Sequence, residues 1–394
     1  MTKNRTRHSP RCLDFFCGIG GLTVGFELAG IQALGGIDNW QDAKQTFEHN
    51  LSPLRCLLSD LTRTTVSEIE DFFQIPAKEI DIIAGGPPCQ GFSTVGKRDI
   101  TDPRNSLWHH FRNLVAVIRP AYVVIENVEG MLVTEGGKVR DLVIASFAEI
   151  GYQMVSRLLI AADYGVPQQR KRAFFFGWID GLCPPEFPVS SSKRYVSVAD
   201  AIFDLPPLNA GEMCRQYNSP PYTDYQIARR KNAPLLLNHE AAKHSAQLVE
   251  RLKHIPDGGN RKSIPAHLQP KSGFHNSYAR LASDKPAIAV TSNMRKPSSA
   301  RATHPTQHRG LTVREGLRLQ SFDDDFEVLG SRNSQYLQVG NAVPPLLGLA
   351  VGKEILKAYQ SNLDDEILRA RFNRAQLSNT SLKVPIQLEL QLTV

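Results

Sequence analysis

One cysteine lies in a setting that suits a nucleophile. Cys89 follows Pro87 and Pro88, which come directly after an apolar, strand-like run at residues 80–84, and a polar stretch at residues 93–105 comes after it. The two prolines fix the backbone that leads into the cysteine, and the polar stretch could move as a lid. A core cysteine, the ordinary alternative, needs neither feature. The sequence therefore indicates that Cys89 lies at the ligand-binding edge of the fold and not in the core.

An acid and two arginines lie beside other strand-like runs of the sequence. Glu126 directly follows another strand-like run at residues 122–125, so in a parallel sheet it would emerge at the same edge as Cys89. Arg170 and Arg172 alternate in the sequence QQRKR and would point to one face of an extended segment. The alternatives are an exposed acid at a strand end and a solvated basic surface, although the arginines lead straight into an apolar run.

The sequence DFFCGIGGL at residues 14–22 indicates a site for a nucleoside cofactor. A strand-like run ends there in a glycine-rich turn and a helix pattern begins. Glycines let the backbone approach a ligand and point its N–H groups at it. Asp38 follows the next strand-like run and could accept both ribose hydroxyls. The turn alone could be purely structural, and the absence of GxxxxGKS or GxxxxGKT from the sequence excludes a P-loop.

Strand and helix patterns alternate over the first 180 residues, which favours an α/β protein with a doubly wound, mostly parallel sheet. In such a sheet the strand ends that carry Cys89 and Glu126 meet at one edge, where these folds bind ligands. The strand-like runs are residues 12–16, 33–37, 56–58, 80–84, 122–125, 154–160 and 173–178. The helix-like segments include residues 21–29, 40–49, 106–117 and 139–150.

Proline, serine and basic residues dominate from Gly181 onward, which indicates a second, smaller, loop-rich domain. Helical periodicity returns at residues 312–322 and 345–359. Residues 384–394 alternate like a strand, which packs on the chain's own small domain or, as the less favoured interpretation, pairs across a dimer. We expect a first domain at 1–180, a second at 181–310, a segment completing the first at 311–360, and an extension of uncertain role at 361–394.

The basic charge of the chain is concentrated in the second domain. The 394 residues carry a net charge of +7. Residues 181–310 hold 18 Lys and Arg against 9 Asp and Glu, whereas the rest of the chain holds 28 against 30. A basic module on a near-neutral body is what a polyanion partner requires. A solvated basic face is the alternative of equal weight.

Composition excludes several classes of protein. Apolar residues make up 41% and charged residues 22% of the chain, which argues against a disordered or fibrous protein. No run approaches the roughly 18 apolar residues of a membrane span, and no secretory signal follows the basic N-terminus. The six cysteines include no CxxC pair, so we expect reduced thiols, no metal site and a cytoplasmic location.

Taken in order, these blocks resemble the cytosine-5 DNA methyltransferase family, in its prokaryotic type. The resemblance rests on GGPPCQGFS, ENV and QQRKR, on TVRE with RLQSF from Thr312, and on QVGNAVPP from Gln338. It covers residues 11–357, and the variable region of the family falls on the basic segment 181–310. It implies the fold of S-adenosylmethionine-dependent methyltransferases, with 181–310 as the target-recognition domain and 311–360 completing the catalytic domain.

The resemblance implies a covalent methyl transfer to DNA. S-Adenosylmethionine would supply the methyl group to C5 of a cytosine, flipped out of a short specific duplex sequence, after Cys89 adds to C6. Glu126 would act at N3 of the ring. Arg172 would lie closest to the base, and Arg170 would support it.

The resemblance also implies a cofactor pocket. Asp38 would hold the ribose of S-adenosylmethionine, and Asp60 would bind the adenine amino group. Asn39 stands where many family members have an aromatic or other apolar residue over the adenine, and Ala289 stands where members usually carry threonine. The expected cofactor-binding residues are Phe16, Cys17, Gly18, Gly20, Gly21, Leu22, Asp38, Asn39, Asp60, Leu61, Pro88, Leu107, Asn341 and Val343.

We expect double-stranded DNA as the partner of a monomeric enzyme with no membrane contact, and a companion restriction endonuclease fits the architecture. Two alternatives stay open: a tRNA methyltransferase of the same chemistry, and a DNA-binding relative without activity. The long segment between Arg172 and Thr312 favours DNA, and the intact Cys89 argues against an inactive relative. The candidate phosphate contacts are Arg229, Arg230, Lys231, Arg261 and Lys262.

Overall fold

The computed structural model describes residues 9–88, 106–190, 194–230, 232–270, 277–299 and 301–364. Four features singled out in the sequence lie outside the described residues: Cys89, the polar stretch at 93–105, Lys231 and the strand pattern at 384–394.

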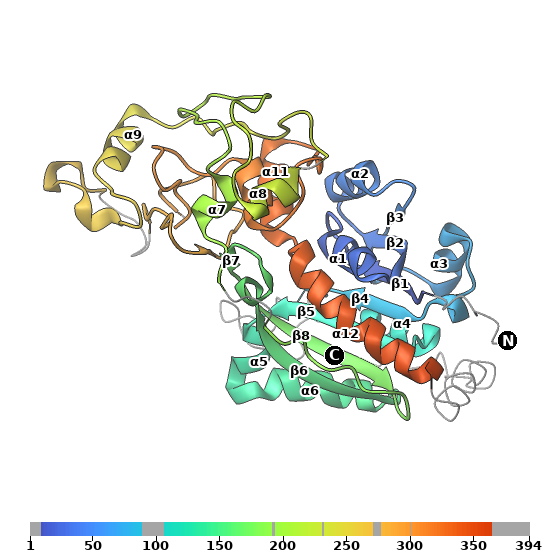
Figure 1. Ribbon diagram of the computed structural model, residues 1–394. Coiled ribbons are helices and arrows are strands. Elements are labelled where there is room, and N and C mark those ends of the chain that lie inside the picture. The colour runs from blue at the N-terminus through green and yellow to red at the C-terminus, as the bar shows by residue number, and fades with distance from the viewer. Residues whose placement is uncertain are drawn as a thin grey trace, which may run out of the picture.

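A seven-stranded sheet forms the centre of the molecule (Figure 1), with the strand order β3-β2-β1-β4-β5-β8-β6. The five strands from β3 to β5 pair in parallel, and β8 runs antiparallel to both of its neighbours. The predicted doubly wound, mostly parallel sheet is therefore confirmed, with each strand within a few residues of its predicted place. The strands are β1 (Arg11–Phe15), β2 (Gln32–Asp38), β3 (Arg55–Leu58), β4 (Ile82–Gly85), β5 (Tyr122–Val128), β6 (Tyr152–Ile160) and β8 (Lys171–Ile179).

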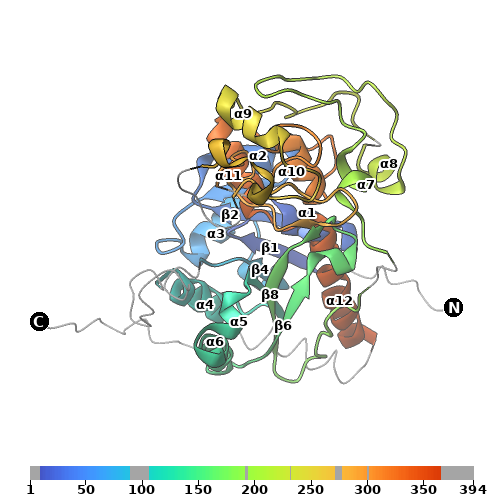
Figure 2. The same cartoon turned by 90° about the vertical axis from the view of Figure 1, so that its left-hand side faces the viewer.

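Helices cover both faces of this sheet, as the burial of its central strands requires. Strand β5 is buried from Tyr122 to Asn127, so neither of its faces meets water. Helices α1 and α12 lie on one face, and α4, α5 and α6 lie on the other (Figures 1 and 2). The helices around the sheet are α1 (Gly21–Ala29), α2 (Gln41–Asn50), α3 (Val66–Phe73), α4 (Ser106–Ile118), α5 (Gly130–Val133), α6 (Lys138–Ala148) and α12 (Pro345–Asp364).

The C-terminal helix α12 packs directly on the first helix of the chain. The contact is close because glycines face each other: a Cβ atom on Gly25 of α1 would lie 2.6 Å from backbone atoms of Gly348 in α12. Any side chain at Gly25 would therefore push the two helices apart. The last described helix therefore packs against the first helix of the sheet domain.

A second hydrophobic core lies beside the sheet. Short helices of the segment 181–310 and the helices α10 and α11 share its buried residues, such as Val198, Val290 and Leu317. Packing thus groups α10 and α11 with this segment, while α12 belongs to the core of the sheet. The elements here are α7 (Val198–Ile202), α8 (Asp224–Arg230), α9 (Ala246–Lys253), α10 (Val313–Leu319), α11 (Arg332–Asn341) and the short strands β7 (Gln168–Gln169) and β9 (Ala287–Ile288).

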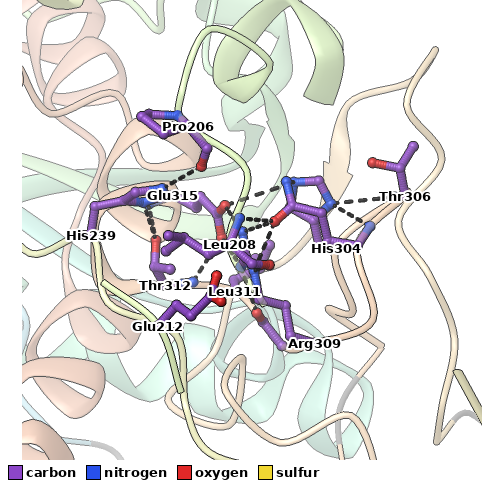
Figure 3. A network of polar contacts seen from close by, with 12 residues as sticks. Pro206, Leu208, Glu212, His239, His304, Thr306, Arg309, Leu311, Thr312 and Glu315 are labelled. Atoms are coloured by element: carbon purple, nitrogen blue, oxygen red, sulfur yellow. Dashed lines mark hydrogen bonds and ion pairs between the residues drawn. The ribbon is translucent and has the colours of Figure 1, made fainter. Parts of the chain in front are cut away.

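Helix α10 is buried along its whole length and is fixed by ion pairs. Glu315 accepts two hydrogen bonds from the guanidinium of Arg309, at 2.6 and 2.9 Å, and His239 contacts Thr312, the N-cap of α10 (Figure 3). Burial alone would raise the pKa of the Glu315 carboxyl, but Arg309 holds it well below its usual value. Separating Arg309 from Glu315 would leave a buried charge without a partner, which is costly. The network therefore fixes the position of the segment 181–310 relative to α10.

The predicted second, loop-rich region is confirmed by its short elements, while its boundaries stay a prediction. Among the described residues, no helix is long and apolar enough to cross a membrane.

Candidate active site

A cavity of about 860 Å³ opens at the carboxyl ends of β1, β2, β4 and β5. The strand order reverses between β1 and β4, and open α/β sheets bind ligands at such a switch point. Residues that precede α12 close its other side. The lining residues are Asp14, Phe16, Cys17, Gly18, Ile19, Leu22, Asp38, Asn39, Trp40, Gly86, Pro87, Pro88, Glu126, Asn127, Val128, Arg170, Arg172, Leu337, Gln338, Gly340, Asn341, Ala342 and Val343.

The glycine-rich turn after β1 holds Asp38, the last residue of β2. Phe16 and Gly18 both have positive φ angles, 58° and 53°, which bend the chain sharply before α1. The Gly18 N–H donates to one carboxylate oxygen of Asp38, and the Trp40 N–H donates to the other, each at 2.9 Å. Each oxygen keeps a lone pair for a further donor. Burial raises the pKa of the Asp38 carboxyl despite these two bonds.

Two glycines of the same turn shape the cavity without lining it. A Cβ atom on Gly21 would lie 2.0 Å from the carbonyl oxygen of Val343, so only glycine lets α1 begin this close to the segment before α12. A Cβ on Gly20 would meet Phe47 and Leu51 of the neighbouring α2 region. Gly21 therefore allows α1 to approach the segment before α12, and Gly20 allows the turn to approach α2.

Asp14 lines the cavity although it was not among the predicted site residues. It is buried at the end of β1 and accepts a hydrogen bond of 2.7 Å from the Thr23 hydroxyl. Burial raises the pKa of its carboxyl to about 7, and the negative charges of Asp38 and Glu126 act in the same direction. A cationic ligand nearby would stabilise the charged form of this carboxyl. Its place at the end of the first strand was the signal that could have identified it.

Glu126 and Arg172 form an ion pair at the cavity wall. The Arg172 Nε and a Glu126 carboxylate oxygen are 2.7 Å apart, and the two side chains are only 17% and 12% exposed. The antiparallel pairing of β8 with β5 causes this contact, because it sets Arg172 opposite Val128 at the end of β5. This contact joins two of the four predicted catalytic residues, and a third, Arg170, lines the same cavity.

Arg170 lies deeper than the sequence suggested. Its guanidinium is buried and donates to the carbonyl oxygens of Val290 and Gly340, both at 3.0 Å. Burial lowers its pKa to about 9, and the charge of Arg172 adds to this effect. Arg170 therefore joins the segment after β9 to the end of α11. Ala289, the second departure from the family pattern, is half-buried just before Val290.

The backbone that leads into Cys89 is held against β5. The side-chain amide of Asn127 donates 2.7 Å to the carbonyl oxygen of Pro87. Pro88 lines the cavity and is the last described residue before Cys89. A Cβ atom on Gly86 would lie 3.4 Å from a carboxylate oxygen of Glu126, so the diproline segment runs close to the predicted acid.

Besides Gly20 and Gly21, three further predicted cofactor residues do not line the cavity. Asp60 is exposed and accepts hydrogen bonds from the N–H and hydroxyl of Thr62, which lower the pKa of its carboxyl. Leu61 belongs to the core of the sheet, and Leu107 packs against that core. In contrast, Trp40 lines the cavity next to the exposed Asn39, so an aromatic side chain is present one position beyond the expected one.

The doubly wound sheet, the ligand cavity at its switch point and the acid at the end of β2 define a Rossmann-like fold of the methyltransferase type. The chain belongs to the C-5 cytosine-specific DNA methylase family, whose family model matches residues 10–357. It is therefore an enzyme, a DNA (cytosine-5-)-methyltransferase.

Known relatives agree with this assignment. The chain is 40% identical to the Type II methyltransferase M1.HphI of Haemophilus parahaemolyticus over 88% of this chain and 86% of that one. It is 34% identical to the Type II methyltransferase M.DdeI of Desulfomicrobium norvegicum, over 95% and 93% of the two chains.

Solved structures show the same fold. A putative DNA modification methyltransferase encoded within an Escherichia coli prophage matches with a TM-score of 0.72 and 26% identity, over 89% of this chain and all of that one. A DNMT2 variant of Spodoptera frugiperda matches with a TM-score of 0.55 and 17% identity, over 89% of this chain and 99% of that one, which supports the fold alone.

Proposed function

We propose that this enzyme transfers a methyl group from S-adenosylmethionine to C5 of a cytosine in a short duplex DNA sequence. The base is flipped out of the helix, and Cys89 adds to its C6. One observation carries the proposal: a single cavity is lined by the Glu126–Arg172 ion pair, by Asp38 in the glycine-rich turn, and by Pro88, the neighbour of Cys89. DNA is favoured over tRNA because the family model and the relatives are those of DNA methylases.

The residues of the cavity fit S-adenosylmethionine, which is cationic and carries a ribose. A Cβ atom on Gly18 would meet no atom within 4 Å, so the turn leaves open space beside it. Asp38 would accept the ribose hydroxyls, and Trp40 would give the adenine an aromatic neighbour. The buried carboxyl of Asp14 suits a positive charge. When bound, S-adenosylmethionine supplies an electrophilic methyl group.

The side chains of the cavity then perform the chemistry of the base. The thiolate of Cys89 forms a bond to C6, the C5–C6 π electrons form a C4–C5 double bond, and those of the C4–N3 double bond move to N3. The product is an enamine that is nucleophilic at C5. Glu126 shares a proton with N3 and so limits the charge that builds up there. After C5 is methylated, loss of its proton expels the thiolate from C6 and restores the aromatic ring.

The two arginines have different tasks in this proposal. Arg172 orients the Glu126 carboxylate through its Nε and donates from one terminal nitrogen to the Lys171 carbonyl oxygen, and the N–H groups not used in these bonds would face the oxygen of the base. Arg170 is bonded to two carbonyl groups, which suits a supporting role beneath Arg172.

We expect two of the basic residues proposed from charge, Arg229 and Arg230, to contribute little to the DNA footprint. Arg229 forms a 2.8 Å ion pair with Asp323, and Arg230 lies over the ring of Tyr217 and donates to Ser219. These arginines hold the second core together and are removed from the candidate phosphate contacts. Lys262 is exposed and stays a candidate.

Lys262→Ala tests the footprint. Each phosphate contact that is lost should reduce the slope of log K against log salt by about one unit for duplex DNA. Titrating DNA binding at several salt concentrations measures this slope. Lys353→Ala is the matched control, because it removes the same charge from an exposed site on α12. Equal slopes for the two variants would place the footprint elsewhere.

Asp38→Ala tests the cofactor site. We expect S-adenosylmethionine to bind about 1.5–3 kcal/mol more weakly, because a charged acceptor of hydrogen bonds is lost, while DNA affinity changes little. Calorimetric titration measures both affinities. Asp71→Ala, an equal change at an exposed position of α3, is the control. Unchanged cofactor affinity in Asp38→Ala would remove this residue from the site.

A further inference from the structure

Gln168, at the start of β7, is fully buried and uses both ends of its side-chain amide. Its oxygen accepts a 2.7 Å hydrogen bond from the Val290 N–H. Its nitrogen donates to the carbonyl oxygen of Leu319 at 3.0 Å and to the side-chain oxygen of Gln320 at 2.9 Å. One side chain thus joins the segment after β9 to the C-terminal end of α10.

Gln320 carries the connection onward to the cavity. It is also fully buried, and its side-chain nitrogen donates to the carbonyl oxygen of Val339 at 2.8 Å and to that of Ala342 at 3.4 Å. Gly340 to Val343, at this same turn, line the cavity opposite the glycine-rich turn. Two glutamines in series therefore link Val290 to the wall of the cofactor cavity.

This link, the amide relay of Gln168 and Gln320, has a fixed direction. At one end it accepts from a backbone N–H, and at the other it donates to backbone carbonyl oxygens, so neither amide can turn over without setting two oxygens against each other. A buried amide that loses its partner is costly, and hydrogen bonds in series reinforce one another. The relay consequently holds its two ends at a defined separation.

The relay joins the region beside the predicted catalytic residues to the wall of the cofactor cavity. Methyl transfer requires these two regions to keep a fixed relative position. Val290 belongs to the core of the segment 181–310 and is bonded to Arg170 beside the Glu126–Arg172 pair. The turn from Gly340 to Val343 belongs to the cofactor cavity. A misplacement of about 1 Å between reacting groups can cost on the order of 10²-fold in rate.

We propose that Gln168 and Gln320 are positioning residues for methyl transfer, which set the target base and the cofactor in register through the amide relay. The inference rests on the proposed function, since it assumes that both ligands share this cavity. Neither glutamine touches a reacting atom. Their removal is therefore expected to change the rate of transfer more than the fold.

The test compares two buried glutamines that undergo the same change. Gln168→Met removes the relay while keeping a similar volume. Gln226→Met is the matched control, because Gln226 is equally buried in α8 and also makes three hydrogen bonds, to the N–H groups of Tyr222 and Thr223 and to the carbonyl oxygen of Ala199. Melting temperature, affinity for S-adenosylhomocysteine, and kcat and KM for methyl transfer are measured for the unmodified enzyme and both variants.

We expect both variants to lose stability to a similar degree, and only Gln168→Met to lose about 10²-fold in kcat and to show a raised KM for the cofactor. Equal kinetics in Gln168→Met and Gln226→Met would overturn the relay. An unmodified enzyme that binds no S-adenosylhomocysteine would instead overturn the proposed function, so the two failures are distinct.

A second variant keeps the test decisive if Gln168→Met folds poorly. Gln320→Met breaks the same relay at its other member, and it is expected to reproduce the loss in kcat. Because the two glutamines act in series, the double variant should be little worse than either single one. Fully additive losses, or a Gln320→Met enzyme with unmodified kinetics, would refute the relay.

Discussion

Cys89→Ser is expected to abolish a covalent complex that the unmodified enzyme forms with DNA carrying 5-fluorocytosine. The thiolate can add to C6 of this base and the methyl group can be transferred, but fluorine cannot leave C5 as a cation. The adduct therefore persists through denaturing electrophoresis, and only when S-adenosylmethionine is present. Serine is a weak nucleophile at its ordinary pKa, so Cys89→Ser should give neither adduct nor methylation.

Peptide mapping of the adduct checks which cysteine is attached. Cys17 also lines the cavity, but its Sγ lies 3.7 Å from that of the buried Cys56, and burial raises the pKa of its thiol well above the ordinary value. A thiol held protonated in this way is a poor nucleophile. Cys183→Ser, which changes a half-buried cysteine elsewhere, is the matched control and should keep the adduct.

Two results would contradict this mechanism in different ways. An adduct that survives in Cys89→Ser would assign the nucleophile to another residue. The lack of any adduct in the unmodified enzyme, on DNA that it demonstrably methylates, would rule out covalent addition altogether.

Glu126→Gln should slow methyl transfer by roughly 10²–10⁴-fold, the usual contribution of a positioned acid or base. Glutamine has nearly the same shape and can still accept a hydrogen bond from the Arg172 Nε, so the geometry of the cavity wall is kept while the group that exchanges a proton with N3 is lost. Single-turnover rates on saturating DNA measure the effect without interference from product release.

Glu129→Gln is the control for this change. Glu129 lies three residues further along, is 43% exposed and pairs at 3.3 Å with Lys171. Its replacement should leave the single-turnover rate close to that of the unmodified enzyme. If Glu126→Gln and Glu129→Gln are equally active, proton supply at N3 comes from another group.

The arrangement of the sheet could be predicted because its strands are short apolar runs separated by helix patterns. The antiparallel direction of β8 could not, since an apolar run reads the same in either direction. That direction has a consequence for the site: it sets Arg172 beside the end of β5, where Glu126 lies.

The cavity could be predicted in part for a similar reason. Residues at strand ends, such as Asp38 and Glu126, were found because the topology alone brings them together. Asp60 was misplaced relative to the cavity because its position depends on how the chain turns after β3, where Thr62 holds its carboxylate. Trp40 and Gln168 were not predicted as site residues. Their roles depend on the direction in which their side chains point, which the sequence does not give.

The count of basic residues was also limited as a guide to the DNA contacts. It located the positive segment of the chain, but it could not distinguish an arginine that is free from one that is already paired. Arg229 and Arg230 are bound within the protein by Asp323 and Ser219. A charge excess thus predicts a kind of partner better than it predicts the contacts.

The closure of α12 on α1 has a consequence for synthesis on the ribosome. The glycine-rich turn is made early, whereas the wall at Gly340 to Val343 and the helix that covers α1 come more than three hundred residues later. At about 5–20 residues per second, a nascent chain carries half of its cavity for tens of seconds. During that time the face of α1 that packs on α12 lacks this partner, and the cavity lacks the wall at Gly340 to Val343.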